Sequence, residues 1–363
     1  MKVIALLGRK DEPTDGVADY CKFLAPALLK HNIELEVARV PWAERGWSQA
    51  MRWLSSESRK WTGEWVLLQY NALAWSRRGF PVRARRVLKL LQRRGTRCGV
   101  VFHDAHAFEG LRFRDRLRGM IQNWTMLELY KHAERSAFTV PLNSAEWLPS
   151  ERSRAAFIPI GANIPNLCIH RSYTAAETPK VVAVFSVTGG DACARETQDI
   201  AHAVRSVNAQ LGPVRLEVFG RGAENAQGLL EETLSVPGIE LHVRGIIPAE
   251  EITRTLAAAH VLLFVRGVIN SHRGTAIAGI SCGLPVVAYG KAGDDPAIDA
   301  AGCQLALWHN PNALAAELRH VLSDARLWQA LHERSLRAQA EYFSWEAVAS
   351  RYAQLLSTSE TRQ

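Results

Sequence analysis

The chain has 363 residues, which is too long for one ordinary hydrophobic core and fits two domains. Hydrophobic residues make up 47% of it and charged residues 22%, a balance typical of globular proteins. No apolar run reaches the roughly eighteen residues of a membrane-spanning helix, and the opening MKVIALLGRK is too short for the apolar region of a signal peptide. We therefore expect neither kind of segment and interpret the opening residues as a first strand.

The cysteines indicate a reducing environment. Six are scattered along the chain without a Cys-x-x-Cys pair: Cys21, Cys98, Cys168, Cys193, Cys282 and Cys303. This distribution predicts reduced, mostly buried thiols and no structural zinc. Together with the composition, it leads us to expect a cytoplasmic protein.

The net charge of +8 is unevenly distributed. Residues 1–165 hold 27 Lys and Arg against 16 Asp and Glu, whereas residues 166–363 hold 17 against 20. The basic first half indicates an anionic partner: a membrane surface, nucleic acid or a phosphate-bearing substrate.

In the first half, short apolar runs alternate with segments of helical spacing, which predicts strands over residues 2–7, 33–40, 65–69, 98–102 and 137–141. Tyr70 and Asn71 follow the third of these strands, and His103 and Asp104 follow the fourth. Open α/β sheets bind ligands at the carboxyl ends of their strands, so these residues are candidates for a binding site.

The segment HDAH places His103, Asp104 and His106 within four residues. Two imidazoles and a carboxylate are compatible with a metal site, but no third His or Cys lies nearby in the sequence. We therefore interpret them as hydrogen-bonded loop residues and predict no metal.

Residues 77–97 hold nine Arg or Lys and no Asp or Glu. Pro81 is placed to start a helix, and apolar residues cover only part of its circumference. Such a charged run most often forms a solvated face. Because no acidic residue within it can pair with these cations, we favour an anionic membrane surface as its partner.

The second half continues the alternation of strands and helices, which predicts a second, right-handed parallel sheet. A strand over residues 181–187 leads to a helix that carries Arg195. A later strand ends in Gly220, Arg221 and Gly222, a tripeptide that is almost uninformative alone. From local sequence, Arg195 is equally consistent with an exposed helix residue.

Residues 260–290 predict a strand, a loop, a helix and a second strand. The helix starts with Arg273, Gly274 and Thr275, after a loop that contains glycine. Free backbone amides, the positive end of a helix and a guanidinium meet at this point. That combination is typical of a phosphate-binding site.

The run SCGLPVVAYG, residues 281–290, together with the loop and helix before it, resembles the donor-binding segment of retaining glycosyltransferases of family four. This family has the GT-B fold, in which two Rossmann-like, doubly wound α/β domains face each other. The family usually carries two glutamates eight positions apart on the two sides of the loop. The matching positions here are Asn270 and Ala278.

The resemblance implies a domain organisation as well as a fold. An acceptor-binding domain spans residues 1–165, a linker spans 166–179, and a nucleotide-sugar-binding domain spans 180–340. Residues 341–363 form a last helix, which returns to the first domain, and a tail.

The resemblance also assigns roles to individual residues. It implies catalytic roles for His103, Arg195 and Arg273. The donor is expected at Gly220, Arg221, Gly222, Asn270, Ser271, His272, Gly274 and Thr275. The acceptor is expected at Asp15, Gly16, Tyr70, Asn71 and Asp104. The segment DGVADY, which contains Asp15 and Gly16, is equally consistent with a simple N-capped crossover helix.

The implied activity is transfer of a sugar from a nucleotide-diphosphate sugar to a glycan or lipid-linked acceptor, with retention and without metal or cofactor. The implied setting is cell-surface polysaccharide or glycolipid synthesis, with the protein cytoplasmic or peripheral on the inner face of the cell membrane. The replaced glutamates motivate an alternative, a catalytically silent GT-B protein that binds a nucleotide or a partner. A nucleic-acid binder is disfavoured because no recognition motif accompanies the basic charge.

Overall fold

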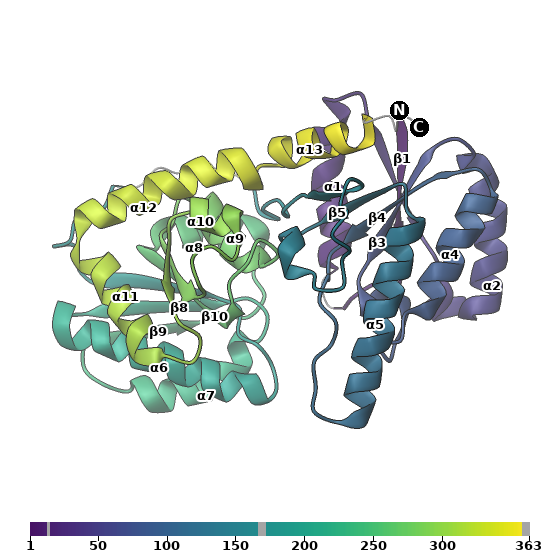
Figure 1. Cartoon of the computed structure of the whole chain (residues 1–363). Coiled ribbons are helices and arrows are strands. Elements are labelled where there is room, and N and C mark those ends of the chain that lie inside the picture. Colours follow the sequence, from purple (N-terminus) through teal and green to yellow (C-terminus); the bar gives the residue numbers. More distant parts are fainter. Residues whose placement is uncertain (13–14, 166–171, 358–363) are drawn as a thin grey trace. The chain divides into compact units, whose positions relative to one another are not determined.

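The computed structural model describes residues 1–12, 15–165 and 172–357. The chain divides into two compact units, one made of Met1–Gly161 with Trp345–Gln363 and the other of Ala162–Ser344. Figure 1 shows a sheet with flanking helices in each unit.

The first unit contains a six-stranded parallel sheet in the order β2-β1-β3-β4-β5-β6. Its strands are β1 (Lys2–Leu7), β2 (Glu34–Arg39), β3 (Trp65–Tyr70), β4 (Arg97–Phe102), β5 (Arg135–Phe138) and β6 (Ala155–Phe157). Its helices are α1 (Gly16–Leu29), α2 (Trp42–Glu57), α3 (Ala72–Trp75), α4 (Val82–Arg93), α5 (Phe113–His132) and α13 (Trp345–Ser357), with short 3-10 turns η1 (Ser58–Trp61) and η2 (Leu142–Ser144).

The central strands of this sheet are buried on both faces. All six residues of β3, WVLLQY, are buried, as is typical of parallel sheets covered by helices on each side. Side chains of β3 and β4 share one hydrophobic core with Val87, Leu88 and Leu91 of α4. The continuous apolar runs in the sequence therefore reflect burial on both sides.

The last helix belongs to the first unit, as the sequence predicts. In α13, Trp345 stacks on Phe23 of α1 with ring centroids 5.8 Å apart, and the Tyr352 hydroxyl lies 2.9 Å from that of Tyr20. A Cβ atom at Gly161 would lie 2.7 Å from the Trp345 ring, so only glycine fits beneath it. The chain thus returns to pack on α1.

The second unit contains a six-stranded parallel sheet in the order β12-β11-β10-β7-β8-β9. Its strands are β7 (Lys180–Phe185), β8 (Val214–Phe219), β9 (Ile239–Val243), β10 (Val261–Val268), β11 (Val286–Tyr289) and β12 (Cys303–Ala306). Its helices are α6 (Asp191–Leu211), α7 (Ala223–Leu234), α8 (Ala249–Ala258), α9 (Gly274–Ser281), α10 (Pro296–Ala300), α11 (Pro311–Ser323) and α12 (Ala325–Ala338), followed by a π-helical turn, η3 (Gln339–Phe343).

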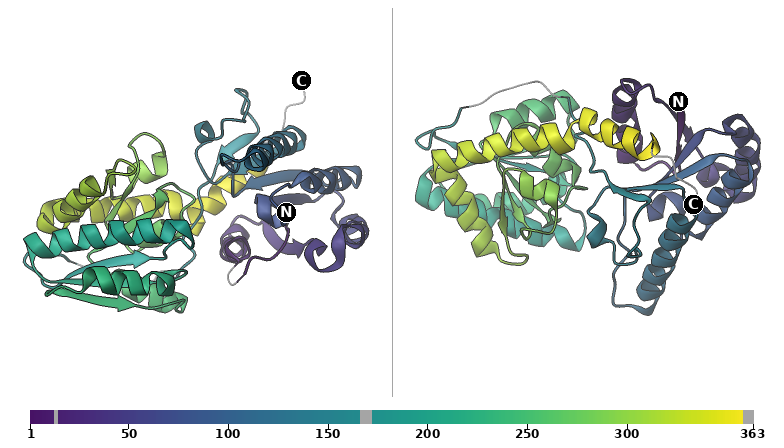
Figure 2. Two further views of the ribbon diagram at one scale, coloured as in Figure 1. Left: turned by 90° about the horizontal axis from the view of Figure 1, so that it is seen from below. Right: turned by 45° about the horizontal axis from the view of Figure 1, so that its top comes forward.

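Helices cover both faces of each sheet, as Figure 2 shows. In both sheets the strand order reverses beside the first strand of the unit, so each is doubly wound. This confirms the fold class expected from the sequence, with ligand sites anticipated at the carboxyl ends of the strands.

The boundaries between the two units lie a few residues from the expected ones. The chain leaves the first unit at Gly161 and re-enters it at Trp345. Within the expected linker, residues 166–171 lie outside the described residues. Tyr173, also in that stretch, is buried in the core of the second unit, where it stacks on Trp328 and donates a hydrogen bond to the Leu322 carbonyl at 2.5 Å.

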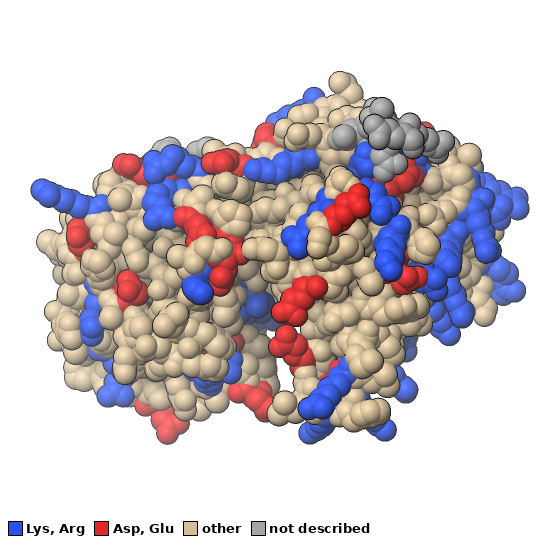
Figure 3. Space-filling view, viewed as in Figure 1, with Lys and Arg blue, Asp and Glu red and all other residues tan. Residues whose placement is uncertain are grey.

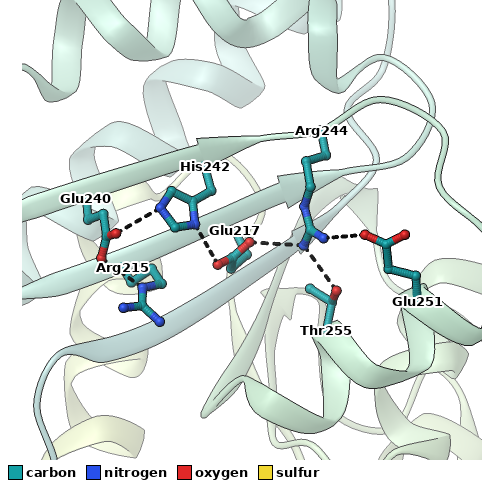
Figure 4. A network of polar contacts seen from close by, with 7 residues as sticks. All are labelled: Arg215, Glu217, Glu240, His242, Arg244, Glu251 and Thr255. Carbon is teal, nitrogen blue, oxygen red and sulfur yellow. Dashed lines mark hydrogen bonds and ion pairs between the residues drawn. The ribbon is translucent and has the colours of Figure 1, made fainter.

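A network of polar contacts links β8 and β9 to α8 in the second unit (Figure 4). His242 lies between Glu217 and Glu240, at 3.0 and 2.9 Å. Arg244 contacts Glu217 at 3.0 Å and Glu251 of α8 at 2.8 Å. Arg244, directly after β9, thus joins α8 to Glu217 of β8.

Two expectations from composition concern thiols and membrane spans. Cys21, Cys98, Cys193, Cys282 and Cys303 are free and at least partly buried, whereas Cys168 lies outside the described residues. In the described part of the chain, no helix combines the length and the apolar character needed to cross a bilayer.

Candidate functional site

The Gly-Arg-Gly turn after β8 packs directly on the loop after β7. Gly220 and Gly222 have φ of +88° and +82°, which residues with a Cβ rarely adopt. The Val187 N–H donates to the Arg221 carbonyl at 3.0 Å, and a Cβ atom at Gly222 would lie 2.1 Å from the Val187 carbonyl oxygen. The two glycines therefore permit the close approach that fixes Arg221 beside this loop.

The loop before α9 is a compact turn. The Arg273 N–H donates to the Asn270 carbonyl at 3.0 Å, and the His272 N–H donates to the Asn270 side-chain oxygen at 3.0 Å. The Ser271 N–H donates to a carboxylate oxygen of buried Asp295 at 2.7 Å. Asp295 therefore holds the turn from a distance of 24 residues along the chain.

Arg273 is the N-cap residue of α9, and Gly274 and Thr275 are its first helical residues. The first amides of a helix have no partners within the helix, and the helix dipole adds partial positive charge at this end. Arg273, Gly274 and Thr275 are each only partly buried. The predicted helix start is confirmed.

A third arginine, Arg266, interacts with the charges of Arg273 and Arg221. It lies near the end of β10, where the strand register is irregular. Burial lowers the pKa of Arg266, and the charges of Arg273 and Arg221 lower it further, while Glu196 opposes the change. The Arg273 guanidinium lies 3.4 Å from the position that a Cβ atom would take at Gly267. The charges of Arg273 and Arg221 thus both act on Arg266, and the Arg273 guanidinium lies beside the same end of β10, which is an arrangement suited to an anion.

Glu196 is the carboxylate that acts on Arg266, and it also has a structural partner. It is buried in α6 and accepts a hydrogen bond from the Thr188 N–H at 2.7 Å. The Thr188 hydroxyl lies 3.5 Å from Nε of Arg266. The loop after β7, the Gly-Arg-Gly turn and the end of β10 therefore meet around this cluster, which we call the arginine cluster (Arg221, Arg266 and Arg273).

Arg195 lies in a separate group of side chains. Its guanidinium carbon is 5.1 Å from the centroid of the Trp308 ring. Burial raises the pKa of Asp199, one turn further along α6, and the Tyr289 hydroxyl and Arg195 act against this rise. Arg195 therefore lies near Asp199, Trp308 and Tyr289. It is not a member of the arginine cluster.

The two positions that match the family's glutamates have different surroundings. Asn270 is partly buried and closes the turn before α9 with its side chain and its carbonyl. Ala278 is buried in α9, where the next residue, Gly279, packs so closely on Leu262 that a Cβ would lie 2.5 Å from it. Neither position carries a carboxylate.

In the first unit, Asp15 has structural partners on both carboxylate oxygens. One oxygen accepts from the Ala18 N–H at 3.1 Å as the N-cap of α1, and the other pairs with Arg39 at 2.8 Å. The space that a Cβ atom at Gly16 would occupy is open within 4 Å. The structure thus shows the capped helix, and it leaves the Gly16 backbone accessible.

Tyr70 and Asn71 stand at the end of β3, as the sequence predicts. Asn71 caps α3 by accepting from the Leu73 N–H at 3.0 Å. Tyr70 is buried, and burial followed by the charge of Asp104 raises its pKa well above the usual value. Its buried hydroxyl has no hydrogen-bond partner among the described residues. Tyr70 and Asp104 are therefore neighbours.

His103 is buried at the end of β4, where a contact with Gln69 determines which ring nitrogen donates. The Gln69 amide nitrogen donates to the Leu67 carbonyl at 3.2 Å, so the Gln69 oxygen is free to accept. That oxygen lies 2.8 Å from Nε2 of His103, which therefore carries the proton. The Tyr20 ring meets the imidazole edge-on at 5.0 Å.

Sequence reasoning missed Arg266, Glu196 and Asp295. Arg266 had a signal, because it is a cation directly after the apolar run of a buried strand. Asp295 precedes Pro296, a pair typical of a helix start, and it does cap α10. Its second contact, to Ser271, has no local signal. Among the described residues, no group of three or more His, Cys, Asp and Glu is arranged to hold a metal ion.

No protein-family model and no curated protein sequence matches this chain. Solved structures do match. HepE from Anabaena, in complex with UDP and glucose, aligns with a TM-score of 0.66 and 13% identity over 98% of this chain and 99% of that one. WaaG, a glycosyltransferase involved in lipopolysaccharide biosynthesis, aligns with a TM-score of 0.64 and 14% identity over 98% and 100%.

Sucrose-phosphate synthase from Thermosynechococcus elongatus aligns with a TM-score of 0.69 and 15% identity over 98% of both chains. At this level of identity the comparison concerns the fold. The similarity spans both units and agrees with two doubly wound, six-stranded parallel sheets. The chain therefore has the GT-B fold.

Proposed function

We propose that this protein is a glycosyltransferase that transfers a sugar from a nucleoside-diphosphate sugar to a glycan or lipid-linked acceptor. The observation that carries the proposal is the arginine cluster beside the amino-terminal end of α9. A diphosphate carries compensating negative charge and accepts hydrogen bonds from guanidinium and backbone N–H groups. Support also comes from two proteins of the same fold, HepE in complex with UDP and the glycosyltransferase WaaG.

The cluster has a direct chemical use in this reaction. When the bond between the anomeric carbon and the diphosphate oxygen breaks, negative charge grows on the leaving oxygens. Cations and amides that are already fixed in place stabilise this charge without reorganising, which is often a large part of catalysis. Arg273 and Arg266 are held by the turn, the strand and Glu196, so they supply such fixed charge.

We propose retention at the anomeric carbon and independence of metal and of any cofactor. In a retaining reaction the acceptor oxygen bonds to the face from which the diphosphate leaves. A diphosphate oxygen then takes the acceptor's hydroxyl proton, so no separate protein base is required. The arginine cluster supplies the positive charge that a metal ion supplies to diphosphates in other enzymes.

We assign the acceptor to the first unit, at the strand ends that carry Tyr70, Asn71 and Asp104, with the accessible backbone of Gly16. His103, at the end of the neighbouring strand β4, is proposed to support turnover from this acceptor region. The cellular role that fits best is polysaccharide or glycolipid synthesis on the cytoplasmic side of a membrane. Arg195, whose charge acts on nearby Asp199, is proposed to support the donor side indirectly.

The proposal is tested by incubating the purified protein with a panel of UDP-, GDP-, ADP- and dTDP-sugars and measuring release of the nucleoside diphosphate. Slow hydrolysis of one donor without acceptor, unchanged by EDTA, is the expected result. Tight binding of a nucleoside diphosphate without turnover of any donor sugar, with or without added glycan and lipid acceptors, would show a binding module. Turnover that requires Mg²⁺ or Mn²⁺ would contradict the metal-independent mechanism.

A further inference from the structure

Helix α5 and the residue pair before it expose large apolar side chains. The exposed fractions are 93% for Leu111, 80% for Phe113, 40% for Leu117, 68% for Met120 and 44% for Trp124. Single exposed apolar residues are common, but a contiguous set marks an interaction site.

These side chains form one stripe along the helix. Phe113, Leu117, Met120 and Trp124 are spaced by four, three and four residues, which places them within an arc of about 60° at about 3.6 residues per turn. The opposite face of α5 is buried, through Gly119, Gln122, Thr125, Met126, Leu129 and Tyr130. The helix therefore turns one face to its core and a second apolar face outward. We call this outward face the α5 stripe.

The helix is held firmly in this orientation. The Gln122 amide nitrogen donates to the Gly79 carbonyl at 2.9 Å, and its oxygen accepts from the Phe108 N–H at 2.6 Å. Arg118 lies over the Phe108 ring at 4.5 Å. The loop before α5 is thus bound to the helix, and the exposure of the stripe follows from the packing of its other face.

The surroundings of the stripe are strongly basic. Residues 77–124 hold 13 Lys and Arg against three Asp and Glu. Arg112, Arg114 and Arg116 are exposed in the first turns of α5, and the neighbouring helix α4 exposes Arg83 and Arg86. Figure 3 shows Lys and Arg gathered over the side of the first unit that Figure 1 labels α2 and α4, and near the lower end of α5.

Helices α4 and α5 are joined through Arg85. It pairs with Glu128 of α5 at 2.8 Å and lies over the ring of Trp124 at 5.3 Å. The basic run predicted from sequence and the α5 stripe are therefore parts of one surface. Arg85 belongs to the run of basic residues for which the sequence showed no acidic partner, and the structure pairs it with Glu128.

We propose that the α5 stripe, with the arginines beside it, binds the surface of an anionic lipid bilayer. Phe113, Leu117 and Met120 are suited to enter the boundary between headgroups and acyl chains, where an amphipathic helix gains from burying apolar area. The arginines then reach the lipid phosphates, and each basic residue near the surface adds about 1 kcal/mol. Binding to an anionic bilayer therefore engages both the apolar side chains of the α5 stripe and the neighbouring arginines.

Other occupants use only part of this surface. A second copy of the chain would bring the same arginines against each other, and like charges oppose such an isologous contact. Nucleic acid would use the arginines but would leave the exposed aliphatic side chains in water. The bilayer satisfies both features. The proposal does not depend on the glycosyltransferase activity, because binding to lipid is measured without turnover.

The test measures co-sedimentation with phosphatidylcholine vesicles at low and raised salt. One set of vesicles contains about 30 mol% of the anionic lipid phosphatidylglycerol, and the other contains none. The variant Phe113→Ser/Met120→Ser removes two highly exposed side chains and leaves the charge unchanged. Its matched control is Leu307→Ser, which changes a 65% exposed side chain in the second unit. A second variant, Arg114→Gln/Arg116→Gln, removes charge and leaves the stripe intact.

We expect binding to anionic vesicles at least tenfold tighter than to phosphatidylcholine vesicles, weakened by salt and by the arginine variant. The Phe113→Ser/Met120→Ser variant should bind at least tenfold more weakly than the parent, and Leu307→Ser should bind like it. Unchanged binding of the apolar variant overturns the proposal, as does failure of the parent to bind anionic vesicles at low salt. Sedimentation velocity that shows a dimer of the parent and a monomer of the apolar variant would assign the stripe to a second copy instead.

Discussion

Arg266 and Arg273 come from different elements, the end of β10 and the N-cap of α9, and yet their charges act on each other. Arg221 adds a third charge from the turn after β8. The two neighbouring cations disfavour the charged form of Arg266, and Glu196 opposes them. A bound diphosphate adds negative charge beside Arg266, so its binding should be favoured over that of an uncharged ligand.

The first prediction concerns these side chains. Arg273→Ala and Arg266→Gln should each weaken UDP binding by about tenfold to a hundredfold, since a hydrogen bond to a charged group contributes about 1.5–3 kcal/mol. Uridine, which has no phosphate, should bind both variants like the parent. Isothermal titration calorimetry with the two ligands measures the difference.

Arg254→Gln is the matched control, because Arg254 is an exposed arginine of the same unit that pairs with Glu250 on α8. It should bind UDP like the parent. Equal losses of affinity for UDP and uridine, or no loss of affinity in either cluster variant, would show that the diphosphate does not bind at the arginine cluster.

The second prediction concerns His103. The variant His103→Ala should lower turnover at least about tenfold while the affinity for UDP stays the same, because the imidazole belongs to the first unit and the arginine cluster to the second. Steady-state kinetics and calorimetry on the same preparation measure the two quantities. Since His103 is buried against Gln69, thermal unfolding is recorded in parallel. A folded variant with unchanged turnover would assign His103 a purely structural role.

At the scale of elements, the turn over residues 270–273 depends on a helix that follows it in the chain. One carboxylate oxygen of Asp295 caps α10 through the Ala297 and Ile298 N–H groups, and the other accepts from Ser271. The turn 270–273 and the start of α9 are thus tied to the start of α10. Buried amides that lose such an acceptor are costly, because water does not replace it.

The third prediction follows from this link. Asp295→Ala should lower the free energy of unfolding by about 2–4 kcal/mol, the combined cost of a lost N-cap and an unsatisfied buried N–H. It should also weaken UDP binding, because the turn that carries Arg273 loses its anchor. Asp295→Asn keeps one acceptor oxygen for the cap and should retain most of the stability. Loss of stability with UDP affinity unchanged, measured below the unfolding transition, would show that Asp295 does not position the loop.

At the scale of the whole molecule, the described residues include a hydrophobic core cluster in each unit. One core cluster gathers β1, β3 and β4 with α4, and the other gathers β7, β8 and β10 with α6 and α11. Each is built entirely from residues of its own unit. A chain with two such cores need not unfold in one step.

The fourth prediction is that thermal unfolding, followed by calorimetry, shows two transitions. Leu88→Ala, in the core of the first unit, should lower one of them, and Leu318→Ala, in the core of the second, should lower the other. Each change should cost about 2–5 kcal/mol, as buried leucine truncations do. UDP should raise only the transition that Leu318→Ala lowers. A single transition that both variants and UDP shift equally would contradict independent units.

The sequence by itself determined most of the strands and their order, although β6 was not among the predicted strands. Continuous apolar runs such as WVLLQY predict strands buried on both faces, and Arg273 followed by Gly274 predicts the start of α9; the structure has both. These features depend on neighbours along the chain, because strand burial and helix capping leave local patterns. The periodicity predicted parallel α/β sheets, and the GT-B fold was implied by the resemblance of residues 281–290 with the loop and helix before them.

Only the tertiary structure decided which residues meet. Arg221 and Arg266 are 45 positions apart, and the contact from Ser271 to Asp295 spans 24, so no local pattern relates either pair. The α5 stripe shows the same limit, because apolar spacing in a helix predicts one buried face and does not say which face the rest of the chain covers. In α5 the covered face holds Gly119, Gln122 and Thr125, which pack closely and satisfy their polar groups, and Phe113 and Met120 therefore remain outside.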